Sequence, residues 1–311
     1  MIVLEKVQNE LYSLGYRSLT LLSESKVKRA YVFVAEHQGT NCIVKFWTDE
    51  TPEIVKYGFA SEFKWYTYFN YNEICPRVVD KSDTYFALDY IGRDTIWTAS
   101  KSGQHTAPDE LSRILLGLHH TPIATNVQAV SIQECQELLL ERLKDLFVSG
   151  PKGQDKLSLI SRITNRIILG LAFPILSIRI KRILQEELYR FVNISDFYHG
   201  DLHMNNLVLS EDFARVYVID FECARRSIPG FLADFVYMVS TYHGATNRGA
   251  ELSSDIMNKL AFSEAERDGA IRLLSLYYTA LLLNPRFCLH ANKRENKLKA
   301  AWKFLSTALF L

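Results

Sequence analysis

The sequence has few cysteines, no long apolar run and almost no net charge. Its five cysteines are an odd number, scattered over 311 residues without CxxC spacing, which argues against a disulfide framework and favours a reducing compartment. The most apolar run, residues 167–178, contains Pro174 and is shorter than the ~20 apolar residues that span a bilayer. The N-terminus lacks the apolar core of a signal peptide. These absences predict a cytoplasmic protein without a transmembrane helix.

The balance of charge also limits the partners. The sequence has 36 Lys and Arg against 35 Asp and Glu, so the whole molecule does not attract nucleic acid or a membrane surface. We therefore expect no nucleic-acid partner, and any electrostatic targeting must come from a local patch.

Strand patterns dominate the first hundred residues. Runs of β-branched and aromatic residues at 31–35 and 42–47 flank turn-forming residues at 37–41, which predicts a hairpin. A helical pattern at 53–70 and a further strand at 84–91 follow. This part of the chain is typical of a small antiparallel β lobe with one packed helix.

The rest of the chain is mainly helical. After residues 92–107, which are rich in Gly, Ser and Thr, apolar residues recur at helical spacing in 108–120, 131–148, 156–171, 175–192, 263–283 and 291–309. A chain of this length exceeds the usual size of one hydrophobic core. The sequence predicts an α+β fold with a β lobe (1–91), a connector (92–107) and a helical lobe (108–311), which contains a loop with two short β runs at 198–222.

Two motifs in that loop carry oxygen ligands suited to Mg²⁺. Asp201 and Asn206 lie five residues apart in HGDLHMNN, and Asp220 ends an apolar strand in VIDFE. Mg²⁺ binds through one or two carboxylates together with substrate phosphates. The alternative for each of these side chains is a turn residue that caps its own backbone.

Both motifs, and the order of the elements before them, resemble the aminoglycoside phosphotransferase and choline kinase family, the small-molecule branch of the protein-kinase-like fold. The resemblance covers most of the chain. It implies a bilobal kinase that transfers the γ-phosphate of ATP, with two Mg²⁺ ions, to a hydroxyl of a small molecule or glycan. Within it, Asp201 matches the catalytic aspartate, and Asn206 and Asp220 match the metal ligands.

The same resemblance implies supporting roles for four further residues: His199, His203, Glu222 and Asp234. Position 203 is His where protein kinases have Lys, and Glu222 replaces the Gly of Asp-Phe-Gly. Both differences favour a small-molecule acceptor over a protein. A protein kinase on the same fold remains the alternative.

Lys45 is the candidate for the lysine that reaches the α- and β-phosphates. It lies between apolar residues on a predicted strand, where an unpaired charge would be costly, so it needs a partner. Glu62 on the following predicted helix is the preferred partner, with Glu50 and Glu53 as alternatives. An edge-strand lysine in solvent is the other interpretation.

The loop expected to cover the nucleotide departs most from the kinase pattern. Residues 23–30 contain no glycine, so Ser25 would offer its hydroxyl and amide to the phosphates. Asp89 and Ile91 fall where the backbone should meet the adenine edge. The missing glycines leave open a catalytically weak pseudokinase or a nucleotide-binding regulator.

The acceptor is less constrained. Residues 156–184 contain six basic and no acidic residues, with Arg162 and Arg166 on one face of a predicted amphipathic helix. Such a face could contact anionic lipid or an anionic glycan, which favours a surface-polysaccharide or lipid-linked sugar and peripheral contact with the inner face of a membrane. The alternative is a solvated basic face on a helical core.

Overall fold

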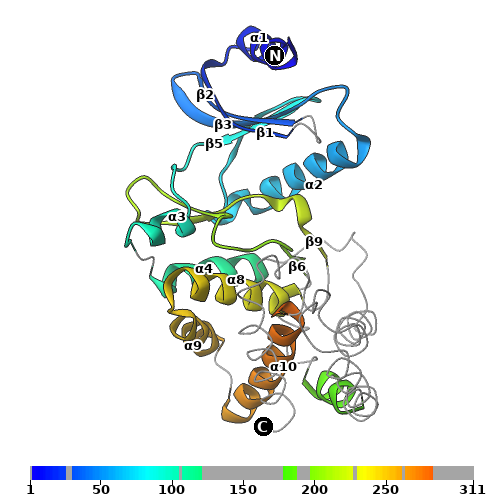
Figure 1. Ribbon diagram of the computed structural model, residues 1–311, viewed down its shortest axis with the longest axis vertical. Helices are drawn as coiled ribbons and strands as arrows, with labels where there is room; N and C mark the ends of the chain where they lie inside the picture. The colour runs from blue at the N-terminus through cyan, green and yellow to red at the C-terminus, as the bar shows by residue number, and fades with distance from the viewer. Residues whose placement is uncertain are drawn as a thin grey trace, which may run out of the picture. The chain divides into compact units, whose positions relative to one another are not determined.

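The computed structural model of the chain is shown in Figure 1. It describes residues 2–25, 30–104, 107–120, 178–187, 197–226, 230–260 and 263–282. The helices predicted at 131–148, 156–171 and 291–309 lie outside these ranges.

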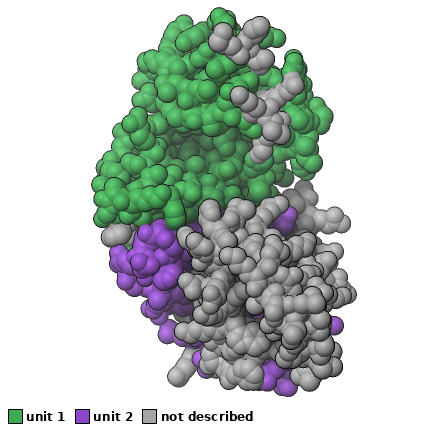
Figure 2. Space-filling view, in the orientation of Figure 1, with its two compact units in different colours: residues 1–118, 199–224 green, residues 119–198, 225–311 purple. Residues whose placement is uncertain are grey.

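The chain divides into two compact units, which Figure 2 colours separately. Unit 1 comprises Met1–Leu118 and His199–Ala224, and unit 2 comprises His119–Tyr198 and Arg225–Leu311. The loop with the two motifs thus belongs to the same compact unit as the N-terminal sheet. The lobe and connector boundaries expected at 1–91, 92–107 and 108–311 remain a prediction.

Unit 1 is built on a five-stranded antiparallel sheet with the strand order β1-β2-β3-β5-β4. Its strands are β1 (Arg17–Ser25), β2 (Ala30–His37), β3 (Thr40–Trp47), β4 (Val78–Lys81) and β5 (Tyr85–Asp89). The predicted hairpin is therefore confirmed as β2–β3, with the turn at Gln38 and Gly39, both of which have positive φ. The mixed α and β composition and the antiparallel sheet confirm the predicted fold class.

The alternation of side chains gives the two faces of this sheet different partners. On one face, Val44 and Phe46 of β3 join Val7 and Leu11 of helix α1 (Ile2–Ser13) in a buried cluster. The residues between them on β3 point to the opposite face, because successive side chains of a strand alternate. Lys45 therefore lies on the second face.

Helix α2 (Glu53–Phe69) packs on that second face (Figure 1). Its Phe59 and Tyr66 lie against Phe86 of β5, with ring centroids 6.5 and 6.0 Å apart. α2 ends at the 3-10 turn η1 (Asn70–Asn72), after which Glu73 takes positive φ. The helix predicted at 53–70 is confirmed.

Shorter elements complete unit 1. They are α3 (Ile96–Lys101), β7 (Leu207–Leu209), β8 (Val216–Val218) and the 3-10 turn η2 (Phe221–Cys223), together with α4 (Pro108–His120), whose last residues belong to unit 2. β7 and β8 form a hairpin, and the amide of Leu209 donates to the Asp94 carbonyl at 2.8 Å. This bond and a bridge between Thr95 and Val208 fasten the hairpin to the segment before α3.

The described part of unit 2 is mostly helical. Its elements are α8 (Gly230–Thr246), α9 (Gly249–Lys259), α10 (Glu264–Leu282), a helical segment at 178–187 and the strand pair β6 (Phe197–Tyr198) and β9 (Arg225–Arg226). The predicted helix at 263–283 is confirmed as α10. In the described ranges, no helix is both long and apolar enough to cross a membrane.

Four of the described helices, α1, α3, α8 and α9, were missed by the sequence patterns. α8 illustrates the reason, because it buries Phe231 and Leu232 as well as Phe235 and Val236. A helix that is apolar over most of its surface shows no narrow stripe, so its period is hard to detect.

Candidate functional site

An ion pair between β3 and α2 anchors the candidate site. The Lys45 Nζ lies 2.5 Å from Glu62 Oε1 and 3.9 Å from Asp220 Oδ1. The Glu62 side chain is 1% exposed and that of Lys45 16%. The predicted pairing of Lys45 with Glu62 is confirmed, whereas Glu53, one alternative, pairs with Lys56.

The carboxylates around Lys45 decide its charge. Burial alone would lower the pKa of the ammonium group, but Glu62 and Asp220 outweigh it and hold the pKa above its ordinary value. Lys45 therefore carries its charge at neutral pH. The neighbouring Asp220 side chain is 38% exposed. A phosphate group is the kind of anion that such a lysine can bind.

Asp220 has an unusual backbone. Its φ of 66° and ψ of 65° place it in the left-handed region, which costs free energy for a residue with a Cβ. Its N–H donates a hydrogen bond of 2.9 Å to the Tyr66 hydroxyl, and the turn η2 begins at the next residue. Non-glycine residues held in this region cluster at functional sites.

The loop from Asp201 to Asn206 is closed by its own hydrogen bonds. The Asn206 Nδ2 donates to the Asp201 carbonyl at 3.0 Å and lies 3.3 Å from the Asp201 carboxylate. Asn206 is buried, whereas the Asp201 side chain is 37% exposed. Asp201 is thus oriented from within the loop and still accessible to a substrate.

The two candidate metal ligands are brought together by the backbone. The Ile219 N–H donates to the Asn206 carbonyl at 3.0 Å, which joins the residue before Asp220 to the end of the Asp201 loop. The β7–β8 hairpin separates Asn206 from Asp220 in the sequence. Because its two strands pair antiparallel, the end of β8 lies next to the start of β7, close to Asn206.

Two histidines hold the Asp201 loop. His199 is fully buried, accepts the Asp201 N–H at Nδ1 over 3.3 Å, and has its ring centroid 4.9 Å from that of Phe221. His203 accepts the Asn205 N–H at Nδ1, and its Nε2 lies 3.6 Å from Asp201 Oδ2. This geometry favours the supporting roles expected for both, which remain predictions.

The other predicted site residues are less closely tied to this cluster. Ser25 ends β1 next to residues 26–29, which the structure does not describe, and Asp89 ends β5, where Arg77 binds it at 2.7 Å. Ile91 follows β5 and is half-buried, and Glu222 is exposed in η2. Their roles in binding nucleotide or supporting the loop remain predictions.

Asp234 lies in unit 2, on α8. It is fully buried, and its Oδ2 lies 3.3 Å from Nε2 of His119, which is equally buried. Its expected role in supporting the Asp201 loop stays a prediction. Arg162 and Arg166 lie outside the described residues.

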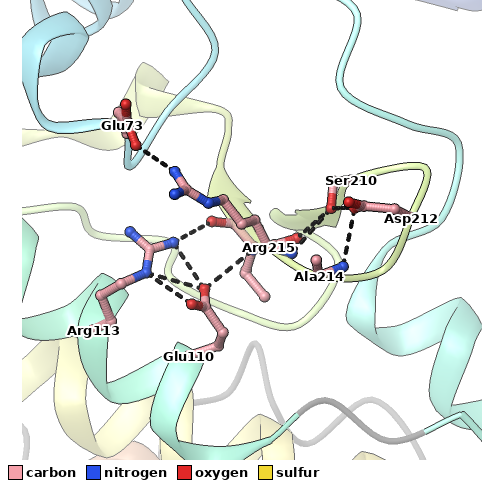
Figure 3. Close-up of polar contacts among 8 residues, drawn as sticks. Glu73, Glu110, Arg113, Ser210, Asp212, Ala214 and Arg215 are labelled. Atoms are coloured by element: carbon pink, nitrogen blue, oxygen red, sulfur yellow. Dashed lines mark hydrogen bonds and ion pairs between the residues drawn. The ribbon is translucent and has the colours of Figure 1, made fainter.

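A polar network that the sequence did not indicate fixes the β7–β8 hairpin (Figure 3). Arg113 of α4 donates to the Val216 carbonyl at 3.0 Å, and the Val216 N–H lies 3.3 Å from a carboxylate oxygen of Glu110. Arg215 binds the Glu73 carboxylate. Because β8 leads directly to Asp220, the network orients the strand that delivers this carboxylate.

The donor set fits Mg²⁺. Asn206 uses its amide nitrogen for the bonds to Asp201, so its amide oxygen is the atom that can bind a metal. The Asp220 carboxylate is partly exposed and offers the second ligand. Among the described residues no group of three or more His, Cys, Asp and Glu could hold a metal alone. Two protein ligands supplemented by phosphate oxygens and water match the way Mg²⁺ is usually bound with a nucleotide.

Comparison with solved structures identifies the fold. An aminoglycoside phosphotransferase from Streptomyces rimosus in complex with ADP and streptomycin is 16% identical, with 92% of this chain and 99% of that chain covered and a TM-score of 0.53. The Plasmodium vivax ethanolamine kinase is 15% identical over 96% of this chain and 85% of that chain, with a TM-score of 0.54. A choline kinase from Cryptosporidium parvum is 11% identical over 96% and 90%, with a TM-score of 0.53.

Sequence comparison alone finds less. No family model matches the sequence, and no curated protein matches it. The predicted resemblance is nevertheless confirmed at the level of structure: the chain has the bilobal, protein-kinase-like fold of the aminoglycoside phosphotransferases and the choline and ethanolamine kinases.

Proposed function

We propose that the protein is an ATP- and Mg²⁺-dependent phosphotransferase that phosphorylates a hydroxyl of a small molecule. The observation that carries this proposal is the convergence of Lys45, Glu62 and Asp220, joined through Ile219 to the Asp201–Asn206 loop. The solved structures of the same fold include a complex with ADP and streptomycin and an ethanolamine kinase, which supports a nucleotide donor and a small acceptor.

Each residue has a distinct task. Lys45, kept charged by its neighbours, binds the α- and β-phosphates, and Glu62 holds its ammonium group. Asn206 and Asp220 would hold Mg²⁺, which would supply neutralisation of the charge on the phosphates. The partly exposed Asp201 carboxylate orients the acceptor hydroxyl and accepts its proton. Phosphoryl transfer needs positioning and charge neutralisation more than covalent chemistry, and these residues supply both.

The first experiment is a screen for ATP consumption with sugars, amino alcohols, aminoglycosides and lipid-linked glycans as acceptors. With an acceptor found, Asp201→Asn should lower turnover by about two to four orders of magnitude, the usual contribution of a general base. Asp220→Ala should abolish it. Circular dichroism controls for folding. Full activity of either folded variant would refute the proposal.

For the acceptor we propose an anionic or lipid-linked sugar, recognised through the basic segment 156–184. In its described part, Arg179, Lys181 and Arg182 are exposed, Arg182 binds Glu186, and Ile178 is 70% exposed. Basic side chains beside an exposed apolar one suit contact with an anionic membrane surface. Flotation with vesicles of neutral lipid, with and without anionic lipid, tests this, and equal flotation would remove the membrane contact.

A nucleotide-binding regulator is the second candidate, because residues 23–30 contain no glycine. Glycine amides usually approach the phosphates in kinases of the protein type. ATP binding without turnover on any acceptor would favour the regulator.

A further inference from the structure

Asp220 needs a partner to keep its backbone conformation. A left-handed conformation is unfavourable for a residue with a Cβ such as Asp220. The Asp220 N–H donates to a side chain and not to a backbone carbonyl of a strand or helix. The direction of its carboxylate follows from this backbone. Whatever holds the Asp220 N–H therefore also sets the place of the candidate metal ligand.

The acceptor of that N–H is the hydroxyl of Tyr66, at 2.9 Å. Tyr66 is fully buried, and burial raises the pKa of its phenol well above the ordinary value, so the hydroxyl stays neutral. Its ring meets Phe221 edge-on, with centroids 5.0 Å apart. The ring and the hydroxyl thus contact two consecutive residues of the VIDFE motif.

Tyr66 follows Glu62 by four residues, about one turn of α2, so the two side chains lie on the same side of the helix. Glu62 holds Lys45, and Tyr66 holds Asp220. One helix therefore fixes both the lysine for the phosphates and the carboxylate for the metal.

The neighbouring Trp65 strengthens this arrangement. Its Nε1 donates to the Ala224 carbonyl at 3.1 Å, just after η2 ends. Phe69, one turn further along α2, stacks on Phe221 at 5.6 Å. α2 consequently holds the segment 220–224 at both of its ends, through Tyr66 at Asp220 and Trp65 at Ala224.

We propose that Tyr66 is a positioning residue for the metal site: its hydroxyl holds Asp220 in the left-handed conformation from which the carboxylate meets Mg²⁺. This inference rests on the proposed function. It differs from a general structural role, because loss of the hydroxyl should change how Mg²⁺ affects ATP binding and leave metal-free ATP binding intact.

Tyr66→Phe tests the proposal, because it removes the hydroxyl and keeps the ring. Calorimetric titration of the full chain with ATP, with and without Mg²⁺, measures the gain in affinity that Mg²⁺ provides. We expect this gain to fall by about tenfold, as is usual when a group that orients a metal ligand is lost. The affinity for ATP without Mg²⁺, which depends on Lys45, should stay within twofold.

Tyr85→Phe is the matched control. Tyr85 is also buried, and its hydroxyl binds Asp80 at 2.7 Å, within the sheet. This variant should lose stability and retain the full effect of Mg²⁺. Hydrogen exchange of the peptide around Asp220 gives a second measurement, which should rise in Tyr66→Phe and stay unchanged in Tyr85→Phe.

The outcomes separate this inference from the proposed function. An unchanged effect of Mg²⁺ in a folded Tyr66→Phe protein would overturn the positioning role, as would an equal loss in Tyr85→Phe. If the unaltered protein does not bind ATP with Mg²⁺, the proposed function itself fails. A Tyr66→Phe protein that does not fold would overturn the assignment too, because the hydroxyl would then be needed for the fold.

Discussion

Lys45 and Glu62 pair where neither charge would be stable alone. Glu62 is almost fully buried, and Lys45 is mostly buried with its ammonium group 2.5 Å away. A buried ion pair contributes little net stability, but either partner without the other leaves an uncompensated charge in the interior. The two residues should therefore respond to substitution as a unit.

We predict that Lys45→Met and Glu62→Met each lower the free energy of unfolding by about 3 to 5 kcal/mol. The double variant should recover much of this loss, because it replaces the pair by apolar side chains, and yet should not regain ATP affinity. Urea unfolding and calorimetric titration with ATP measure the two effects. Additive losses of stability would contradict the coupling.

Asp80 is a charged residue of strand β4, and two of its hydrogen-bond partners are tyrosines outside the candidate site. Burial alone would raise the pKa of its carboxyl, but hydrogen bonds from Tyr85, at 2.7 Å, and Tyr16, at 2.9 Å, lower it below its usual value. A lowered pKa contributes stability that is complete above the unfolded value, near 3.9, and is lost as pH falls through the folded value.

Asp80→Asn should therefore lower the free energy of unfolding at pH 7 by about 1.5 to 3 kcal/mol, the usual contribution of a hydrogen bond to a charged group. The difference from the unaltered protein should shrink as the pH falls below about 4. Urea unfolding across this range measures it, and Asp83→Asn, at an exposed position, is the control. A difference that does not change with pH would refute the role of the charge.

Among the elements, α2 and α8 each hold a neighbouring segment in place through close contacts. α2 connects the sheet to the VIDFE motif through Glu62, Trp65 and Tyr66. α8 lies against β6, which leads into the Asp201 loop, and its first residue is glycine. A Cβ at Gly230 would lie 1.7 Å from the Phe197 carbonyl oxygen, so no other residue fits there without moving the strand.

The same helix offers a matched comparison. Gly230→Ala should lower the free energy of unfolding by about 1 to 3 kcal/mol or more, because backbone atoms must shift. Gly244→Ala should be neutral or stabilise by up to about 1 kcal/mol, since nothing lies within 4 Å of its Cβ and alanine favours helix. Urea unfolding of both variants checks this. Equal effects would show that β6 does not constrain α8.

For the whole molecule, the fold is retained at 11 to 16% identity to the solved structures. At this level of identity the comparison establishes a shared fold, and nucleotide binding by this chain is a prediction. If the protein binds ATP, the nucleotide should stabilise it, because a ligand that binds only the folded state raises the free energy of unfolding.

We expect ATP with Mg²⁺ at 100 times its dissociation constant to stabilise the protein by about 2.7 kcal/mol. Thermal unfolding with increasing ATP measures this as a rising midpoint. Lys45→Met is the control and should shift far less. No stabilisation of the unaltered protein at millimolar ATP would contradict nucleotide binding.

The sequence by itself determined the local features. Alternating and helical patterns predicted the β2–β3 hairpin, α2 and α10, because these periods reflect one buried face. The pairing of Lys45 with Glu62 followed from a charge on an apolar strand that needed a nearby partner on the next helix. Asp201, Asn206 and Asp220 could be proposed as site residues because their chemistry and spacing are local, and their roles remain predictions.

Only the tertiary structure decided the contacts between distant segments. The bond from Asp220 to Tyr66 joins residues 154 positions apart, and that from Trp65 to Ala224 joins residues 159 apart. A tyrosine on an apolar helix face has no local signal that distinguishes a packing role from a polar contact. The backbone conformation of Asp220 therefore depends on a contact with a distant helix, whereas the presence of a carboxylate at this position can be read from the sequence.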